Sequence, residues 1–219
     1  MRRTLAGPSG WPMALYSKHR GLKMISMAKD YTPALVLASS SPRRRELLRL
    51  LSPDFLVVPS EVEEAEAQTP QDLLEIAEAK AAVVAEKFPE SIVIAADTGV
   101  FRDGKSFGKP KDLDEAKSFL SALSGGWHSV FTALVVRKGE SVRKALVETR
   151  VLFRQLSEEE IDWYVQAEEV LDKAGAYAIQ GRAAVFVERI DGDFYNVMGL
   201  PLCALWKLLW EMGWRPKKA

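Results

Sequence analysis

The chain has 219 residues, of which 47% are apolar and 27% charged, a composition typical of a globular protein. At this length we expect about one domain, which can bury roughly 70% of its unfolded surface without a disulfide or a structural metal. Membrane insertion is not expected, because no stretch reaches the roughly 18 consecutive apolar residues of a membrane span. The single cysteine, Cys203, cannot form an intramolecular disulfide and is expected to be a small core residue, so secretion is not indicated.

Basic and acidic residues balance at 30 each, but they are unevenly placed. Residues 1–30 hold six basic residues and one acidic residue, which leaves 24 basic and 29 acidic residues in 31–219, a net charge of −5. A body of this sign is a poor partner for nucleic acid, because duplex affinity comes largely from neutralising phosphates. Any phosphate that the protein binds must therefore meet a local basic cluster.

Residues 1–33 are interrupted by glycines and prolines and show no sustained hydrophobic period, which predicts a disordered leader. The lack of acids before Asp30 is compatible with an organelle transit peptide, but there is no clear amphipathic helix and no apolar signal-peptide core. The favoured explanation of residues 1–33 is translation from an upstream start codon, which adds a segment of little functional importance. We therefore expect a cytoplasmic protein. A single domain over residues 34–214 and a short tail over 215–219 should follow.

From Leu35 onward, short β-rich runs alternate with stretches of helical periodicity, which predicts an α/β fold. Strands are expected over residues 35–38, 55–58, 92–96, 128–136, 142–153 and 185–190. Helices are expected over residues 43–51, 69–88, 112–124 and 157–166, and from 201 onward with an apolar stripe of Leu202, Leu205, Trp206 and Leu209. A hairpin turn is expected at Asp103-Gly104.

Two charged residues interrupt these apolar patterns. Asp97 follows the run 92–96, which is apolar on both faces and should be a central strand that ends at Asp97. The carboxyl end of a strand is where open α/β sheets place ligand sites, and no helix that Asp97 could cap begins before Asp112. Lys80 falls on the apolar stripe of helix 69–88, although a surface lysine whose stem lies along apolar side chains would give the same pattern.

The turn over residues 39–45 joins a strand to a helix and contains three serines followed by Pro42 and three arginines. Free N–H groups and the helix dipole attract anions to the N-terminus of a helix. Basic side chains are electrostatically unfavourable at this end unless an anion is bound there. The turn is therefore a candidate phosphate cradle, with a merely solvated charged face as the alternative. Lys109, held between Gly108 and Pro110, can add a further positive charge.

The acidic segment 61–66 gathers four carboxylates ahead of helix 69–88. Such a run is usually just solvated, but beside phosphate-binding cations one or two carboxylates can hold Mg²⁺ or Mn²⁺ together with substrate phosphates. His19 and His128 are too few and too far apart for a zinc site. There is no Ser-His-acid or Cys-His signature, no Walker loop and no dinucleotide fingerprint.

Taken together, these segments resemble the Maf family of nucleoside triphosphate pyrophosphatases over essentially all of residues 34–212. The matching stretches are Leu37–Leu48, Glu61–Glu64, Ala96-Asp97-Thr98, Gly108-Lys109-Pro110, Leu123-Ser124-Gly125 with His128, Asp172–Tyr177 with Gln180-Gly181, and Gly199-Leu200-Pro201-Leu202. The chain departs slightly from the family's sequence pattern at Gly99, Ala133 and Ala178, and none of these departures removes a charged group. The resemblance implies a two-lobed α/β fold with an elongated mixed sheet flanked by helices and a central cleft, similar to the inosine triphosphate pyrophosphatases.

The resemblance also implies an activity, namely metal-dependent hydrolysis of a nucleoside triphosphate between the α and β phosphates, with Mg²⁺ or Mn²⁺ as cofactor. It implies that Asp97 is the proton acceptor and a metal ligand, and that Glu64 helps to hold the metal. The residues that it assigns to the phosphates are Ser39, Arg44, Lys80 and Lys109. A homodimer is a further implication of the family.

For base choice, the resemblance points to Arg43, Thr98 and Gln180, a trio similar to the subgroup that acts on dTTP and UTP rather than on 7-methyl-GTP. The Gln180 amide suits a pyrimidine edge, yet it does not exclude cytosine because an amide can flip. The implied role is housekeeping of the nucleotide pool, including modified pyrimidine nucleotides. The alternative is a non-catalytic, nucleotide-sensing regulator of cell division or septum formation, which would have no need of a general base.

Overall fold

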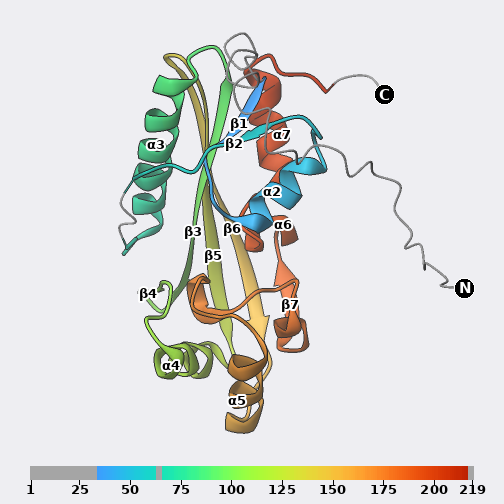
Figure 1. Cartoon of the computed structure of the whole chain (residues 1–219). Helices are drawn as coiled ribbons and strands as arrows, with labels where there is room; N and C mark the ends of the chain where they lie inside the picture. Colours follow the sequence, from blue (N-terminus) through green and yellow to red (C-terminus); the bar gives the residue numbers. More distant parts are fainter. Residues whose placement is uncertain (1–33, 63–65, 217–219) are drawn as a thin grey trace, which may run out of the picture. The chain divides into compact units, whose positions relative to one another are not determined.

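The computed structural model describes residues 34–62 and 66–216 (Figure 1). The predicted leader, Glu64 and the end of the predicted tail lie outside these residues. Within them, seven strands form one mixed sheet in the order β2-β1-β3-β5-β6-β7, and β4 pairs with β3 outside this path. No helix in the described part of the chain has the length and apolar character that a bilayer span requires.

The sheet combines parallel and antiparallel pairs, which confirms the predicted α/β class with an elongated mixed sheet. The first two strands, β1 (Leu35–Leu37) and β2 (Leu56–Val57), are parallel, and β1 is also parallel to β3 (Ile92–Arg102). All other pairs are antiparallel. The remaining strands are β4 (Lys105–Phe107), β5 (Trp127–Lys138), β6 (Ser141–Phe153) and β7 (Val187–Asp191).

The helices begin at the capping residues that the sequence shows. Thr69 and Ser157 each form a capping box, with Asp72 and Glu160 respectively, and Asp112 accepts a hydrogen bond from the Glu115 N–H. The helices are α2 (Pro42–Arg49), α3 (Pro70–Lys87), α4 (Leu113–Leu123), α5 (Glu158–Ala167), α6 (Phe194–Val197) and α7 (Leu202–Glu211). Helix α6 and two 3₁₀ turns, η1 (Ala174–Ala176) and η2 (Arg182–Val185), were not predicted.

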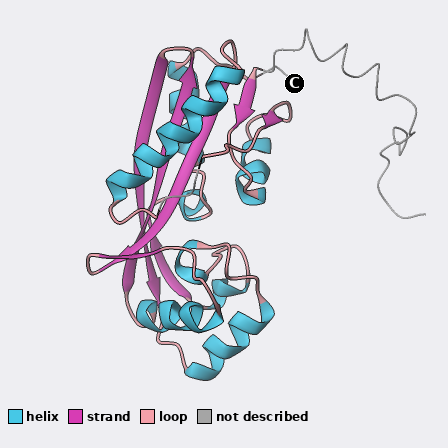
Figure 2. Ribbon diagram, turned by 60° about the vertical axis from the view of Figure 1, so that its left-hand side comes forward, coloured by secondary structure: helices cyan, strands magenta, loops and turns pink. Residues whose placement is uncertain are grey.

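Apolar side chains divide the fold into two lobes. In one lobe, α3 covers one face of the sheet and α2 and α7 cover the other (Figures 1 and 2). In the other lobe, α4, α5 and the 3₁₀ turns pack around the far ends of β3, β5 and β6, with Tyr164, Phe153 and Phe186 fully buried. The long central strands run through both lobes (Figure 2).

The prediction that the central strand ends at Asp97 is wrong. Strand β3 continues to Arg102 because β5 pairs with it from Val93 to Phe101, with Asp97 opposite Ala133. Asp97 therefore lies in the middle of a strand, where the sheet passes from one lobe to the other. The hairpin turn that follows β3 is as predicted, with positive φ angles of 51° at Asp103 and 75° at Gly104.

Two expectations for the last helix are also wrong. Helix α7 buries Leu202, Leu205, Leu208 and Leu209, which form one stripe that faces the sheet. Cys203 lies outside this stripe and is exposed instead of being a core residue. Trp206 is likewise 36% exposed, at the edge of the stripe.

Candidate active site

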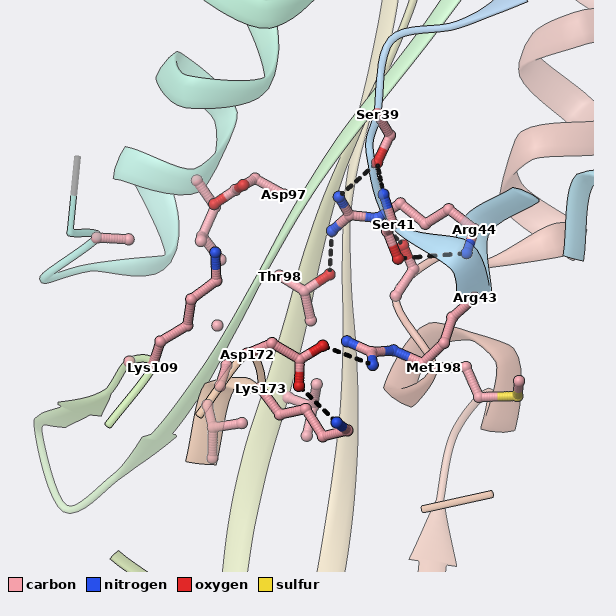
Figure 3. A pocket seen from close by; sticks show the side chains of 18 of the residues that line it. Ser39, Ser41, Arg43, Arg44, Asp97, Thr98, Lys109, Asp172, Lys173 and Met198 are labelled. Atoms are coloured by element: carbon pink, nitrogen blue, oxygen red, sulfur yellow. Dashed lines mark hydrogen bonds and ion pairs between the residues drawn. The ribbon is translucent and has the colours of Figure 1, made fainter. Parts of the chain in front are cut away.

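A cleft of about 770 Å³ opens where β3 passes between the lobes (Figure 3). Its lining comes from the turn before α2, from β3, from the loop after β4 and from the loops that precede η1 and α7. The predicted site residues that line it are Ser39, Arg43, Arg44, Lys80, Asp97, Thr98, Lys109 and Gln180. Glu64 lies outside the described residues, and Glu66 of the same acidic segment lines the cleft.

Lys80 and Asp97, the two residues that interrupt apolar patterns, form an ion pair. Lys80 Nζ donates to Asp97 Oδ1 at 2.6 Å. Lys80 is only 8% exposed, because the apolar face of α3 that carries it packs against β3. A buried ammonium needs a charged partner, so Lys80 is not the surface lysine of the alternative interpretation. The Asp97 side chain is 19% exposed and reaches the cleft.

Arg44 holds together three segments that are far apart in the sequence. Its guanidinium donates from Nε to the Gly199 carbonyl at 2.8 Å and from Nη2 to Thr98 Oγ1 at 2.9 Å. A longer bond of 3.4 Å runs from Nη1 to Ser39 Oγ. The rigid fork of arginine suits this role, since a single ammonium cannot reach three acceptors in these directions. Arg44 therefore has a structural role in addition to its predicted role on phosphate.

The turn before α2 forms only part of the predicted cradle. Ser41 caps α2 by accepting from the Arg44 N–H, and the Ser41 N–H donates to Ser39 Oγ at 3.2 Å. Arg43 and Arg44 line the cleft, but Arg45 is exposed and does not line it. Successive helical residues point about 100° apart, so three consecutive arginines cannot all face one ligand.

An ion pair between the lobes closes one side of the cleft, and its acidic partner was not predicted. Arg43 Nη1 lies 3.6 Å from Asp172 Oδ2, and Lys173 Nζ donates to Asp172 Oδ1 (Figure 3). Partial burial raises the pKa of the Asp172 carboxyl, but the hydrogen bond from Lys173 and the charges of Lys173 and Arg43 outweigh it and lower that pKa overall. Only the Asp172–Tyr177 motif pointed to this segment in the sequence.

His128 is buried beneath the cleft, where its ring Nε2 lies 2.8 Å from the hydroxyl of Tyr177. Burial, aided by the charge of Arg102, lowers the pKa of His128 to about 3, so the ring is neutral at physiological pH. Among the described residues there is no cluster of three or more histidine, cysteine, aspartate or glutamate side chains that could hold a metal by itself. His128 is therefore a core residue that orients Tyr177, which lines the cleft.

Within the described part of the chain, the cleft carries a small excess of basic side chains, five against four acidic ones, although the body of the chain is acidic. Its basic side chains are Arg43, Arg44, Lys80, Lys109 and Lys173, and its acidic ones are Glu66, Asp97, Glu115 and Asp172. Lys109 extends into the cleft on the same side as Asp97 (Figure 3). Such a cluster meets the requirement for a local basic site, and its spread over two lobes suits an extended anion such as a polyphosphate.

Comparisons with known proteins show the family of this chain. The Maf-like protein family model matches residues 34–212. The dTTP/UTP pyrophosphatases of Thermotoga maritima and Pyrococcus furiosus are each 46% identical, over 82% and 84% of this chain and 90% and 97% of their own. That of Bacillus cytotoxicus is 49% identical over 78% of this chain and 91% of its own. The solved structure of the Staphylococcus aureus Ham1 protein aligns with a TM-score of 0.46 and 17% identity, covering 81% of this chain and 98% of that one. The chain belongs to the Maf family.

Proposed function

We propose that this chain is a nucleoside triphosphate pyrophosphatase that hydrolyses dTTP and UTP to the monophosphate and pyrophosphate. Relatives that are 46% identical over most of the chain carry the name dTTP/UTP pyrophosphatase. The structural observation that supports the proposal most directly is the Lys80–Asp97 pair inside a cleft lined by further cations.

A carboxylate at this place favours an enzyme over a nucleotide sensor. Asp97 repels the phosphates that the neighbouring lysines and arginines attract, so a cleft that only bound nucleotide would gain nothing from this carboxylate beyond its pairing with Lys80. A carboxylate is useful there if it accepts a proton or helps to hold a cation. We therefore assign Asp97 the role of proton acceptor for the attacking water.

Hydrolysis needs positioning and charge stabilisation more than covalent catalysis. The water oxygen forms a bond to the α-phosphorus, the bond from that phosphorus to the bridging oxygen breaks, and the electron pair leaves with pyrophosphate. The proton of the water passes to Asp97. Lys80, Lys109 and Arg44 stabilise the negative charge that moves onto the phosphate oxygens.

The donor set of the cleft fits a divalent metal ion. The hydrogen bond that Asp97 makes with the described residues uses Oδ1, which leaves Oδ2 for a cation shared with substrate phosphates. Mg²⁺ typically takes one or two protein carboxylates, so the lack of a larger carboxylate cluster among the described residues is no obstacle. When bound, such an ion neutralises phosphate charge and makes water more acidic. We propose Asp97 as its ligand, together with Glu64.

Base choice falls to the side chains of the cleft that do not hold phosphate. Arg43, Thr98 and Gln180 all line the cleft, and Gln180 is an exposed residue of the loop between η1 and η2. A site that hydrogen-bonds a base edge rejects a base that leaves buried polar groups unpaired. We propose that these three residues select the pyrimidine.

The test is a nucleotide panel assayed for both pyrophosphate and orthophosphate with the full-length protein. We expect pyrophosphate from dTTP and UTP, much less from ATP, GTP or 7-methyl-GTP, and loss of activity with EDTA that Mg²⁺ or Mn²⁺ restores. Release of orthophosphate would contradict the cleavage position, and equal rates on all nucleotides would contradict the substrate assignment. Tight binding of dTTP without turnover would favour the regulator.

A further inference from the structure

A row of hydrogen-bonded groups leads from the cleft into the interior of the sheet. Thr98 on β3 lies opposite Thr132 on β5, and their hydroxyl oxygens are 3.0 Å apart. Thr132 Oγ1 is also 3.0 Å from the main-chain carbonyl oxygen of Asn196 in α6. Thr132 and Asn196 are both 0% exposed, so solvent does not compete for these bonds.

The direction of the protons in this row follows from its inner end. A carbonyl oxygen can only accept, so the Thr132 hydroxyl donates its single proton to Asn196. With its only proton engaged, Thr132 can only accept in its contact with Thr98, so the Thr98 hydroxyl donates its proton to Thr132 Oγ1. In the reverse order, two oxygen atoms would face each other at 3.0 Å without a proton between them in a fully buried place. Such an arrangement is strongly disfavoured.

The outer end of the row is the Thr98 hydroxyl, which is half-buried and lines the cleft (Figure 3). One of its two lone pairs accepts from Arg44 Nη2 at 2.9 Å. Because its proton is directed to Thr132, only the second lone pair remains for a ligand. Thr98 can thus accept a hydrogen bond from the ligand, and it cannot donate one to a phosphate oxygen.

We infer that Thr132 is a positioning residue that determines base specificity, because it fixes the Thr98 hydroxyl as an acceptor. Uracil and thymine carry an N–H at ring position 3, whereas cytosine carries a lone pair there. An acceptor at Thr98 therefore favours uracil and thymine over cytosine. The inference deepens the proposed function and rests on it, since it supplies the discrimination against cytosine that a rotatable Gln180 amide cannot.

The test variant is Thr132→Val, which keeps the shape of the side chain and removes the hydroxyl. The Asn196 carbonyl stays paired, because it also accepts from the Gly199 N–H at 2.9 Å. The Thr98 proton becomes free to turn toward the cleft and to meet cytosine. We expect the ratio of kcat/KM for dTTP over dCTP to fall about tenfold, mainly through a lower KM for dCTP. Thr132→Ser, which retains the hydroxyl, should keep the wild-type ratio.

The matched control is Thr149→Val on β6. Thr149 is also 0% exposed and bonds to Asn196 Nδ2 and to the Asp193 carbonyl, each at 3.0 Å, so its loss disturbs the same buried region without touching Thr98. We expect this variant to lower the melting temperature and to leave the dTTP/dCTP ratio unchanged. A shift of the ratio as large as that of Thr132→Val would overturn the inference, because general loosening of α6 would then explain both.

Two analogues separate the base N–H from the sugar hydroxyl, which could also donate to Thr98. N3-methyl-dTTP lacks the base N–H and should be a poor ligand, whereas 2′,3′-dideoxy-TTP lacks the sugar hydroxyl and should retain the preference over its cytosine counterpart. Loss of that preference in the dideoxy pair would overturn the assignment to the base.

Calorimetric binding of dTTP and dCTP in EDTA keeps the inference separate from the proposed function. The expected change of the affinity ratio in Thr132→Val, together with no pyrophosphate release from dTTP by the wild type in a parallel assay with Mg²⁺, would support the inference and contradict the pyrophosphatase. Pyrophosphate release from dTTP with an unchanged ratio in Thr132→Val would overturn the inference and leave the enzyme assignment intact.

Discussion

Replacing Asp97 by asparagine should remove most pyrophosphate release and leave the fold intact. The amide is nearly isosteric, and its oxygen can still accept the hydrogen bond that Lys80 Nζ now makes at 2.6 Å. It cannot take a proton from water, and a general base typically contributes about 10²–10⁴-fold to the rate. A variant that keeps more than half of the wild-type rate would exclude Asp97 as the proton acceptor.

The same substitution has a cost in stability that the structure allows us to estimate. At 2.6 Å and an effective dielectric constant of about 20, the attraction between the two charges is about 6 kcal/mol, most of which offsets their desolvation. Removing one charge of a fully buried pair costs about 3–5 kcal/mol. Because the Asp97 side chain is 19% exposed and the amide still pairs with Lys80, we expect about 2 kcal/mol, or roughly 4–8 °C in Tm.

A second substitution separates stability from chemistry. In Asp97→Asn/Lys80→Met, the unpaired ammonium is gone, so Tm by calorimetry should recover toward the wild type while activity stays lost. Asp162→Asn is the control, because it breaks the solvent-screened Lys117–Asp162 pair of 2.7 Å and should leave Tm nearly unchanged. If the double variant were no more stable than Asp97→Asn, an uncompensated charge on Lys80 would not be the cause of the loss.

Arg44→Lys keeps a positive charge but loses the guanidinium fork that reaches Gly199 and Thr98, so KM for dTTP should rise about tenfold or more. A KM within twofold of wild type would contradict the role of Arg44 in holding these segments together. The pKa of His128 falls by burial from 6.5 to about 3, so below pH 6.5 the unfolded chain binds a proton that the folded chain does not. Stability that is present at pH 7 is thus lost as pH falls toward 3. In urea melts at pH 7 and pH 5, the free energy of unfolding of His128→Gln should fall by about 2 kcal/mol less than that of the wild type. Equal losses in the two proteins would refute this. Gln180→Glu removes the amide donor and should reduce dTTP and UTP cleavage more than residual ATP cleavage in a kinetic comparison, whereas equal reductions would remove Gln180 from base choice.

Local signals in the sequence predicted most of the elements. The capping residues Thr69 and Ser157 fix where α3 and α5 begin, and the Asp103-Gly104 turn fixes the β3–β4 hairpin, because each depends on a few neighbouring residues. Helix α6 has only four residues, too few to show an apolar period, so its capping residue Asp193 was not enough to predict it. It is held by tertiary bonds, such as the one from Asn196 Nδ2 to the Val130 carbonyl at 3.0 Å.

The site was predictable as a set of anomalies but not as a set of contacts. Lys80 and Asp97 each broke an apolar pattern, which marked them as candidates, yet their pairing depends on how α3 packs on β3. Asp172 had no pattern to break, because it lies in a polar loop and acquires its role from Arg43 in the other lobe. Cys203 was misplaced because leucine-rich composition does not tell which side of α7 faces the sheet.

The length of β3 explains how one strand can carry both of the residues to which we assign proton transfer and base recognition. Asp97 and Thr98 are consecutive, so their side chains point to opposite faces of the sheet: Asp97 toward Lys80 on α3, and Thr98 toward Arg44 of α2. Had the strand ended at Asp97, Thr98 would lie in a turn with no partner opposite it and a freely rotating hydroxyl. Pairing with β5 extends the strand and sets Thr132 against Thr98, so the same ladder that carries the Asp97 carboxylate also orients the hydroxyl that we assign to the base.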